Sequence, residues 1–409
     1  MASAHTALTN TSAAAVAGLP PLALYVHFPW CVRKCPYCDF NSHALEPARD
    51  AAAEGVLPEA VYIDTLLRDL DAECAALGDA RPLVSLFFGG GTPSLFSPVA
   101  IARLLGGIRS RLAFADDVEI TMEANPGTLD EHHFAGYREA GVNRLSIGVQ
   151  SFDDAMLRAL GRIHDGARAR RAIANAQRAG FTRINLDLMH GLPGQDDAGA
   201  VDDLRRALGA GVEHLSWYQL TIEANTVFHR SPPQLPDDDA LARIEDAGFA
   251  LLERAGFGRY EVSAWSRPGC ESRHNLNYWR FGDYLAIGAG AHGKVSTRVG
   301  AGGLQVIRYQ KSRTPDDFRA DSSRRQVREV AGSERAFEFM LNALRLRDGV
   351  SESLFTAHTG LGLPTIAKTL DRLRGRGLMC PDRIGTTALG FRHLDSVVGE
   401  FLPEDADAG

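Results

Sequence analysis

The sequence predicts an α/β protein, namely a partial (β/α)6 barrel followed by a small winged-helix-like α+β module. Three observations support this prediction. Short apolar runs alternate six times with stretches of helical period, as in parallel strands joined by helical crossovers. Each run ends in glycine or polar residues, and such ends converge at the mouth of a barrel. Beyond residue 258 the rhythm stops, which indicates a different architecture for the rest of the chain.

Length and composition limit the possible classes of protein. The 409 residues are too many for a single core, and 45% hydrophobic with 23% charged residues is typical of a soluble globular protein. A net charge of -7 argues against a nucleic-acid partner, and no apolar run approaches a transmembrane segment. Residues 1–20 lack the features of a signal peptide, so we expect a disordered leader. Six cysteines do not make a disulfide framework, which favours a cytoplasmic location.

The barrel core is expected over residues 21–257. Its predicted strands are 22–27, 83–88, 118–122, 144–149, 184–189 and 214–220, and its helices include 60–77 and 241–257. At the ends of these strands lie the cysteines, "GGGTP", "EANP", "QSF", Asp187 and Gln219. A flanking segment, 258–320, should open with a strand at 259–266 and continue through "RHNLNYWRFGDYLAIGAGAHG" (273–293) without helical period.

A polar stretch near residue 315 indicates a boundary, and we expect the C-terminal module over residues 325–402. It should contain an amphipathic helix at 333–346, with Ser333 as its N-cap, and another at 363–378 that ends at Gly377. A short hairpin and a final helix should follow. DNA binding by this module is disfavoured, because no helix is rich in base-reading groups and the tail "PEDADAG" is acidic.

The segment "CVRKCPYCDF" (31–40) carries the strongest chemical signal. Its cysteines are spaced C-x3-C-x2-C, which allows a chance cluster of buried thiols, a zinc site or an iron–sulfur cluster. Structural zinc needs a fourth ligand, and although His27 and His43 are near, the chain has no second C-x2-C knuckle. A four-iron cluster held by Cys31, Cys35 and Cys38 leaves one iron open for the amine and carboxylate of a small molecule. The remaining cysteines, Cys74, Cys270 and Cys380, stand alone and are expected to be ordinary thiols.

This segment resembles the signature C-x3-C-x-aromatic-C of the radical S-adenosylmethionine (SAM) superfamily. The resemblance implies that the methionine part of SAM supplies the missing ligation, so that the open iron is the binding site. It also implies roles for residues that could each be structural when taken singly. The implied cofactor-binding residues are Tyr25, Tyr37, Gly90, Gly91, Thr92, Glu123, Gln150, Arg162 and Asp187.

The residue types suit these implied roles. Glycines let backbone amides approach the methionine moiety, carboxylates accept hydrogen bonds from ribose hydroxyls, and arginine binds a carboxylate through its forked donors. The segment "GAGAHG" (288–293) matches the dinucleotide fingerprint, but "KVSTRV" follows and predicts a strand instead of the required helix. We therefore expect a glycine loop that flanks the cofactor.

Over roughly residues 22–400 the chain is similar to the oxygen-independent coproporphyrinogen III oxidase group, which has two branches. The oxidases carry a further cysteine where this chain has Phe40. The HemW-type haem chaperones carry "CDFN", here residues 38–41, and an H-N-x-x-Y-W motif, here His274, Asn275, Tyr278 and Trp279. An imidazole is a good axial ligand for haem iron, and aromatic rings can pack on a porphyrin. The alternative interpretation is a core histidine beside two aromatic residues.

The resemblance implies a haem chaperone that holds a [4Fe-4S] cluster, SAM and haem, and transfers haem to client proteins such as membrane respiratory enzymes. No catalytic residue is assigned, and whether the protein is an enzyme is left open. One rival function is oxidative decarboxylation of coproporphyrinogen by SAM-derived radicals. Another is radical methyl transfer on a related scaffold.

Overall fold

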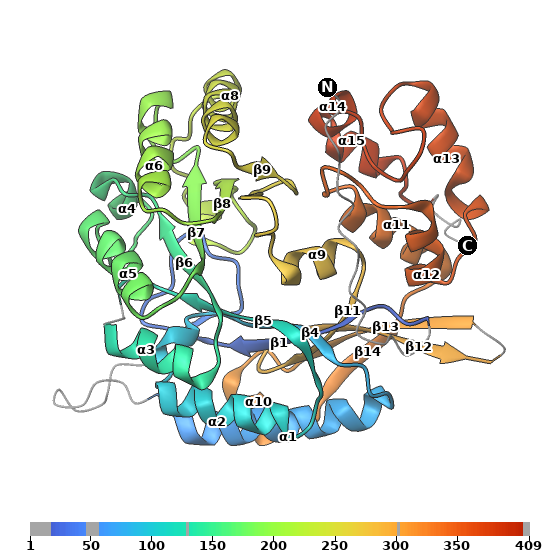
Figure 1. Ribbon diagram of the computed structural model, residues 1–409, viewed down its shortest axis with the longest axis horizontal. Coiled ribbons are helices and arrows are strands. Elements are labelled where there is room, and N and C mark those ends of the chain that lie inside the picture. Colours follow the sequence, from blue (N-terminus) through green and yellow to red (C-terminus); the bar gives the residue numbers. More distant parts are fainter. Residues whose placement is uncertain (1–17, 46–56, 128–130, 301–302, 404–409) are drawn as a thin grey trace.

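The computed structural model describes residues 18–45, 57–127, 131–300 and 303–403 (Figure 1). Residues 1–17 of the expected leader lie outside this range. At the end of that leader, the carbonyl of Pro20 accepts a 2.6 Å hydrogen bond from the guanidinium of Arg81. Among the described residues, no helix is both long enough and apolar enough to cross a membrane.

Six parallel strands form the core of one mixed sheet and follow chain order across it, which confirms the predicted α/β architecture. They are β1 (Leu22–Phe28), β4 (Leu83–Gly90), β5 (Phe114–Ala124), β6 (Arg144–Gln150), β7 (Arg183–His190) and β8 (His214–Gln219). Because neighbouring strands are parallel, their carboxyl ends lie at one edge of the sheet, as the barrel prediction requires.

Helices connect these strands or follow the last of them, and they cover the outer face of the sheet (Figure 1). They are α1 (Glu59–Leu77), α2 (Pro98–Arg109), α3 (Glu131–Ala140), α4 (Asp154–Ala159), α5 (Gly166–Arg178), α6 (Asp197–Gly209), α7 (Val227–Arg230) and α8 (Asp238–Arg254), with a 3-10 turn η1 at Pro93–Leu95. Side-chain caps start several of them. Asp165, Asp196 and Asp237 each accept a hydrogen bond from a backbone amide in the first turn of α5, α6 and α8.

The sheet continues beyond the six strands at both ends. On one side β11 (Asp283–Ile287) pairs parallel with β1, and β12 (His292–Val299), β13 (Gly303–Lys311) and β14 (Arg325–Glu329) follow in antiparallel order, with α10 (Pro315–Ala320) between the last two. On the other side are β10 (Ala264–Ser266) and β9 (Gly258–Arg259). A separate pair, β2 (Trp30–Cys31) and β3 (His43–Ala44), encloses the cysteine segment.

Two expectations for the flanking segment were wrong. The single strand predicted at 259–266 is two short strands, β9 and β10, which pair antiparallel across a turn. The segment expected to lack a helix begins with one, α9 (Arg273–Trp279). The hydroxyl of Ser272 caps α9 by accepting from the amide of Asn275, and a helix of two turns is too short to show a clear hydrophobic period.

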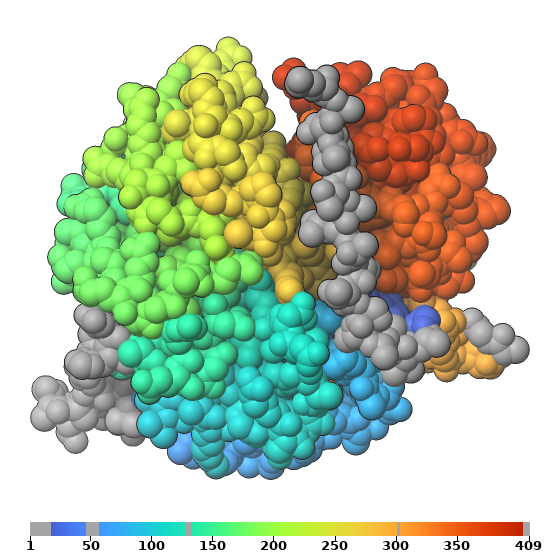
Figure 2. All heavy atoms as spheres, viewed as in Figure 1, coloured from blue at the N-terminus to red at the C-terminus, as the bar shows by residue number. Residues whose placement is uncertain are grey.

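The C-terminal helices form a lobe beside the barrel, drawn in orange and red in Figure 2. They are α11 (Gly332–Ala343), α12 (Glu352–Thr359), α13 (Pro364–Gly375), α14 (Ala388–Arg392) and α15 (Leu394–Gly399). Their apolar faces form a second core, which also takes in Phe281 from the segment after α9. The predicted start of this module at residue 325 falls inside β14, which belongs to the large sheet. The division into domains remains a prediction.

Details of the C-terminal lobe differ from the sequence expectations. Ser333 is not the N-cap of α11, because the helix begins one residue earlier and its cap is Ala331. The chain leaves α13 near the predicted Gly377, which has a left-handed φ of 71° that glycine adopts without strain. A single antiparallel bridge between Met379 and Thr386 stands where the hairpin was expected, and two short helices replace the single final helix.

Acid should destabilise the fold through buried histidines. Burial lowers the pKa of His164 and of His358 to about 4, against about 6.5 in the unfolded chain. Between pH 6.5 and pH 4 each of these histidines is protonated in the unfolded chain but neutral in the folded protein. The free energy of unfolding therefore decreases as pH falls through this range, by at most about 3 kcal/mol for each residue. We expect His358→Gln, which keeps a donor for the Arg280 carbonyl, to reduce the fall in melting temperature between pH 7 and pH 5.

The exposed His229 provides the control for this experiment. His229→Gln should leave the pH dependence of the melting temperature as it is in the parent protein. Equal pH dependence in the parent and the His358→Gln variant would show that His358 is not among the groups responsible.

Candidate functional site

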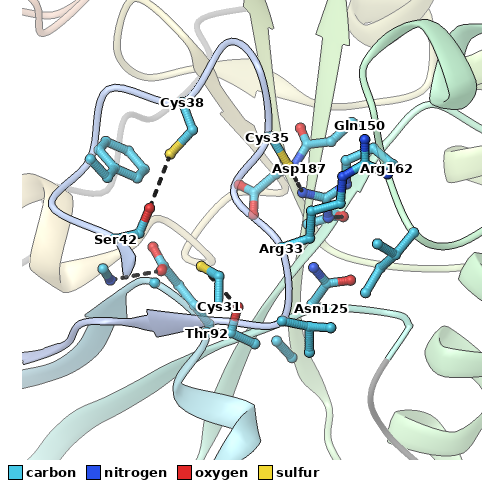
Figure 3. Close-up of a pocket in the computed structure, with 18 of the residues that line it drawn as sticks. Cys31, Arg33, Cys35, Cys38, Ser42, Thr92, Asn125, Gln150, Arg162 and Asp187 are labelled. Carbon is cyan, nitrogen blue, oxygen red and sulfur yellow. Dashed lines mark hydrogen bonds between the residues drawn. The ribbon is translucent and has the colours of Figure 1, made fainter. Parts of the chain in front are cut away.

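A pocket of about 330 Å³ lies at the carboxyl ends of the six parallel strands (Figure 3). All three clustered cysteines line it. The other predicted residues that line it are Tyr37, Gly90, Gly91, Thr92, Glu123, Gln150, Arg162 and Asp187. The predicted residues Tyr25, His274, Tyr278 and Trp279 are not among its lining residues. Tyr218 of β8 also lines it, so each of the six strands, or the loop that follows it, contributes to this site.

Each clustered cysteine has a different polar neighbour in the pocket, as Figure 3 shows. The hydroxyl of Thr92 donates to Cys31 Sγ at 3.5 Å, and the guanidinium of Arg162 donates to Cys35 Sγ at 3.6 Å. Ser42 Oγ lies 3.8 Å from Cys38 Sγ. Burial raises the pKa of the Cys31 and Cys38 thiols, so bonds to a metal are needed to hold them as thiolates at neutral pH.

The donor set of the pocket fits a cluster better than a single ion. Within the described residues, no three side chains of Cys, His, Asp or Glu lie close enough to hold one metal ion. Structural zinc needs such a compact set. In a four-iron cluster each thiolate binds a different iron, so Cys31, Cys35 and Cys38 can stand further apart around one space. The donor set of the pocket therefore fits a cluster with one iron left for another ligand.

Asn41 fixes the end of the cysteine loop. Its side-chain amide donates to the carbonyls of Ala289 and Arg313, at 3.0 and 2.8 Å. Its own carbonyl accepts from His27 Nε2 at 2.8 Å, so the other ring nitrogen of His27 accepts a 2.9 Å hydrogen bond from the hydroxyl of Tyr25. Tyr25 thus lies beside the pocket and supports the cysteine loop through His27.

The "GAGAHG" loop joins β11 to β12, so a strand follows it and the dinucleotide interpretation is excluded. Gly290, with a φ of 79°, lies so close to Asn41 that an added Cβ would come within 2.2 Å of its amide nitrogen. The amide of Gly288 donates to the buried carboxylate of Asp69. This loop therefore supports the cysteine segment from outside the pocket.

Two glycines after β4 allow a close backbone approach. An added Cβ at Gly91 would lie 2.5 Å from the Trp30 carbonyl oxygen, and Gly90 has a φ of 112° that disfavours any other residue. The amide of Gly90 donates to Glu123 Oε2 at 3.1 Å. Gly90 and Gly91 of the predicted "GGGTP" segment therefore form a part of the pocket wall that carries no side chain.

Two carboxyl groups give the pocket a preference for cations. Burial, together with the nearby charge of Asp187, raises the pKa of Glu123 to about 8, and burial also raises the pKa of Asp187. A positively charged ligand would relieve this cost by stabilising the ionised forms. SAM carries an ammonium and a sulfonium group, so the chemistry of Glu123 and Asp187 fits it.

Sequence reasoning missed several pocket residues. Asn125, Ser146, Gly148 and Tyr218 also line the pocket, together with Arg33 from the cysteine loop. Tyr218 takes the place expected for Gln219, which is exposed instead. Successive side chains of a strand point to opposite faces, and this alternation was the signal that could have identified Tyr218.

Tyr218 also holds a strained residue in place. Its hydroxyl donates to Gln150 Oε1 at 2.9 Å. Gln150 has a φ of 66°, a left-handed value that is uncommon for residues other than glycine, and it follows an irregularity in the pairing of β6 with β7. Such strain is concentrated at functional sites.

The predicted haem residues lie on α9, away from the pocket lining. The ring of His274 stacks on Phe87 at 4.4 Å, and Tyr278, one helical turn later, lies 5.3 Å from it. The alternative interpretation placed both aromatic residues beside the imidazole. Trp279 instead packs against the C-terminal core, with the guanidinium of Arg345 at 4.3 Å from its ring. Residues four apart share a helix face, whereas residues five apart diverge.

His274 has the properties of a neutral imidazole with an unused nitrogen. Burial lowers its pKa to about 4, so the ring is uncharged at pH 7, the form that binds metals. Its Nδ1 is buried and has no hydrogen-bond partner among the described residues. Asn275 does not contact it through the side chain, which instead donates to the hydroxyl of Tyr260 at 3.1 Å.

The fold and the three-cysteine pocket define a radical SAM protein. Residues 25–207 match the family model of the radical SAM superfamily, and residues 330–383 match that of the HemN C-terminal domain. Across 94% of its length the chain is 48% identical to "Heme chaperone HemW" of Escherichia coli, covering 99% of that protein. The chain belongs to the HemW family.

More distant relatives agree with this assignment. "Radical S-adenosyl methionine domain-containing protein 1, mitochondrial" of Bos taurus is 41% identical, over 93% of this chain and 87% of that protein. Among solved structures, coproporphyrinogen III oxidase (HemN) from Escherichia coli superposes with a TM-score of 0.75 at 21% identity, covering 94% of this chain and 91% of that one. At this identity the similarity shows a shared fold.

Proposed function

We propose that this protein is a haem chaperone that acts in the cytoplasm. It would hold a [4Fe-4S] cluster on Cys31, Cys35 and Cys38 with SAM beside it, and haem at the "HNLNYW" segment, for transfer to client proteins such as membrane respiratory enzymes. The observation that carries the proposal is the identity of 48%, over nearly the whole chain, to a protein named as a heme chaperone. The neutral imidazole of His274, whose Nδ1 has no hydrogen-bond partner in the described part of the chain, supports it chemically.

The pocket residues would prepare the cofactor site. Bound SAM would complete the coordination of the open iron. Glu123 and Asp187 would pair with its positive groups and hydroxyls, and Gly91 would let its methionine moiety approach the backbone. Arg162 would keep its hydrogen bond to the sulfur of Cys35. Because the "HNLNYW" residues lie outside this lining, haem and SAM would not compete for one pocket.

The rival function, coproporphyrinogen oxidation, is disfavoured by Phe40. This side chain is 59% exposed and lines the cysteine pocket, at the position where the oxidase branch has a further cysteine. A phenyl ring cannot bind a metal or donate a hydrogen bond there. Phe40, which distinguishes the two branches in sequence, therefore lines the pocket in which their chemistry would differ.

We expect the protein not to convert coproporphyrinogen to protoporphyrinogen. The assay would supply SAM and a reductant to the anaerobic protein and separate the porphyrin products by chromatography, with the Escherichia coli oxidase as positive control. The same sample should bind haem, seen as a Soret band on titration. Turnover comparable to the control would assign the oxidase function, and failure to bind haem would refute the chaperone proposal.

A further inference from the structure

A chain of hydrogen bonds runs through the barrel interior from the cofactor pocket to the "HNLNYW" segment. Asn185 Nδ2 donates to Asp187 at 2.8 Å, and Asn185 Oδ1 lies 2.6 Å from His214 Nδ1. His214 Nε2 lies 2.9 Å from the hydroxyl of Tyr260, which accepts from Asn275 Nδ2 at 3.1 Å. Asn185 and His214 are 2% and 1% exposed, so water does not compete for the bond between them.

The chemistry of the groups fixes the direction of every bond in this chain. The carboxylate of Asp187 only accepts, so the amide nitrogen of Asn185 faces it and the amide oxygen faces His214. Burial lowers the pKa of His214 well below its usual value, so the ring is neutral and carries its single proton on Nδ1. Tyr260 must then donate to Nε2, and its oxygen is left to accept from Asn275.

Neighbouring hydroxyl groups agree with this direction. Ser146 Oγ donates to Asp187 and accepts from Asn185 Nδ2, at 3.0 and 2.8 Å. On the other side, Ser216 Oγ donates to Asn185 Oδ1 at 3.2 Å. The amide of Asn185 is therefore held by donors at its oxygen end and by acceptors at its nitrogen end.

Such a chain of hydrogen bonds has one other arrangement, in which the bond from Asn185 to Asp187 is given up and the bonds from Asn185 to Asn275 are reversed. If Asp187 turns to donors of a ligand, the amide of Asn185 can rotate and present its nitrogen to His214. The ring of His214 then carries its proton on Nε2 and donates a hydrogen bond to the Tyr260 oxygen. The Tyr260 hydroxyl in turn donates to the oxygen of Asn275, whose amide has turned over. In that arrangement the orientation of the Asn275 amide, next to His274, would depend on what Asp187 binds.

We propose that Asn185, His214 and Tyr260 are positioning residues that couple occupancy of the cofactor pocket, sensed at Asp187, to the setting of the "HNLNYW" segment. The coupling to haem rests on the proposed function, but the chain of hydrogen bonds itself does not. Linkage requires the effect to be reciprocal, so haem would change the affinity for SAM by the same factor as SAM changes the affinity for haem.

The first test needs no haem and uses the cluster-loaded protein labelled with 15N-histidine. The signals of His214, assigned by their loss in His214→Gln, should show the proton on Nδ1 without SAM. Saturating SAM should move them toward the Nε2–H form. A proton on Nε2 in the absence of SAM, or signals that SAM leaves unmoved, would overturn the proposal.

The second test measures haem affinity by Soret titration with and without SAM. In the parent protein the two dissociation constants should differ at least about fivefold, the lower end of typical coupling. Tyr260→Phe keeps the ring but breaks the chain, so this difference should vanish. The control is Tyr137→Phe, which removes a buried hydroxyl that donates to the carbonyls of Ser94 and Phe96, outside the chain of hydrogen bonds. This variant should keep the difference between the two dissociation constants.

The outcomes separate the two proposals. A parent protein that binds haem with an affinity independent of SAM, or a Tyr260→Phe variant that retains the difference, would refute the coupling. A parent protein that binds no haem would refute the chaperone function, and the His214 spectra would still decide whether the chain responds to the pocket.

Discussion

Replacing Cys35 with alanine is expected to abolish the iron–sulfur cluster, and with it the SAM binding that needs an open iron. The same result is expected for Cys31→Ala and Cys38→Ala, because the pocket holds three thiols for three irons and no fourth cysteine is among its described lining residues. Iron and sulfide content, and the absorption of the anaerobically purified protein, would measure the loss. SAM should also alter the paramagnetic resonance spectrum of the reduced parent protein.

The remaining cysteines provide matched controls. Cys270 lies near Glu213, with Sγ 3.5 Å from the carboxylate, and Cys74 lies on α1 outside the pocket lining. Cys270→Ala and Cys74→Ala should retain the full iron and sulfide content. Cys380 is buried in the C-terminal lobe and donates to the Thr386 carbonyl, so serine is the suitable replacement there. A cluster that survives loss of any one of the three pocket cysteines would contradict the assignment.

His274→Ala should weaken haem binding at least about tenfold while leaving the cluster intact, since even the loss of a group that supports a metal ligand typically costs 10–100-fold. The imidazole is the only one in the "HNLNYW" segment, and it is neutral and has an unpartnered nitrogen among the described residues. Haem titration followed at the Soret band, with iron content measured on the same samples, tests this expectation. His274→Cys should give a haem complex with a shifted Soret band, because a thiolate would replace the axial nitrogen.

Two results would count against this role. An unaltered Soret position and affinity in His274→Ala would place the haem ligand elsewhere. Loss of haem and cluster together would show that His274 supports the fold by stacking on Phe87, as a core histidine would. The exposed His229 serves as the control, and His229→Ala should change neither measurement.

The parts of the fold that could be predicted depend on local sequence. β1 and β4 are mostly apolar segments of seven and eight residues, β7 carries a regular set of apolar residues, and α5 and α6 begin at aspartate caps. Each signal therefore lies within the element that it specifies. The short helix α9 and the broken strand at 259–266 could not be predicted in the same way. Their conformations depend on a cap and on a turn of a few residues, which carry no period.

For the site, the sequence determined the chemistry. The cysteine spacing specified three thiolates on one loop, and the polar ends of successive strands specified which residues would meet, since parallel strands bring their carboxyl ends to one edge. The same regularity predicted that Glu123 and Asp187 would face the same space. Spacing and strand order are properties of the chain, so they can be read from it.

Only the tertiary structure decided how distant segments contact one another. It placed Tyr218 instead of Gln219 in the pocket, turned Trp279 toward the C-terminal lobe, and joined Asn185 to Asn275 through His214 and Tyr260. These contacts join strands, a turn and a helix that are separate in the sequence. Their formation depends on side-chain direction and packing between elements, for which no pattern within a single element carries a signal.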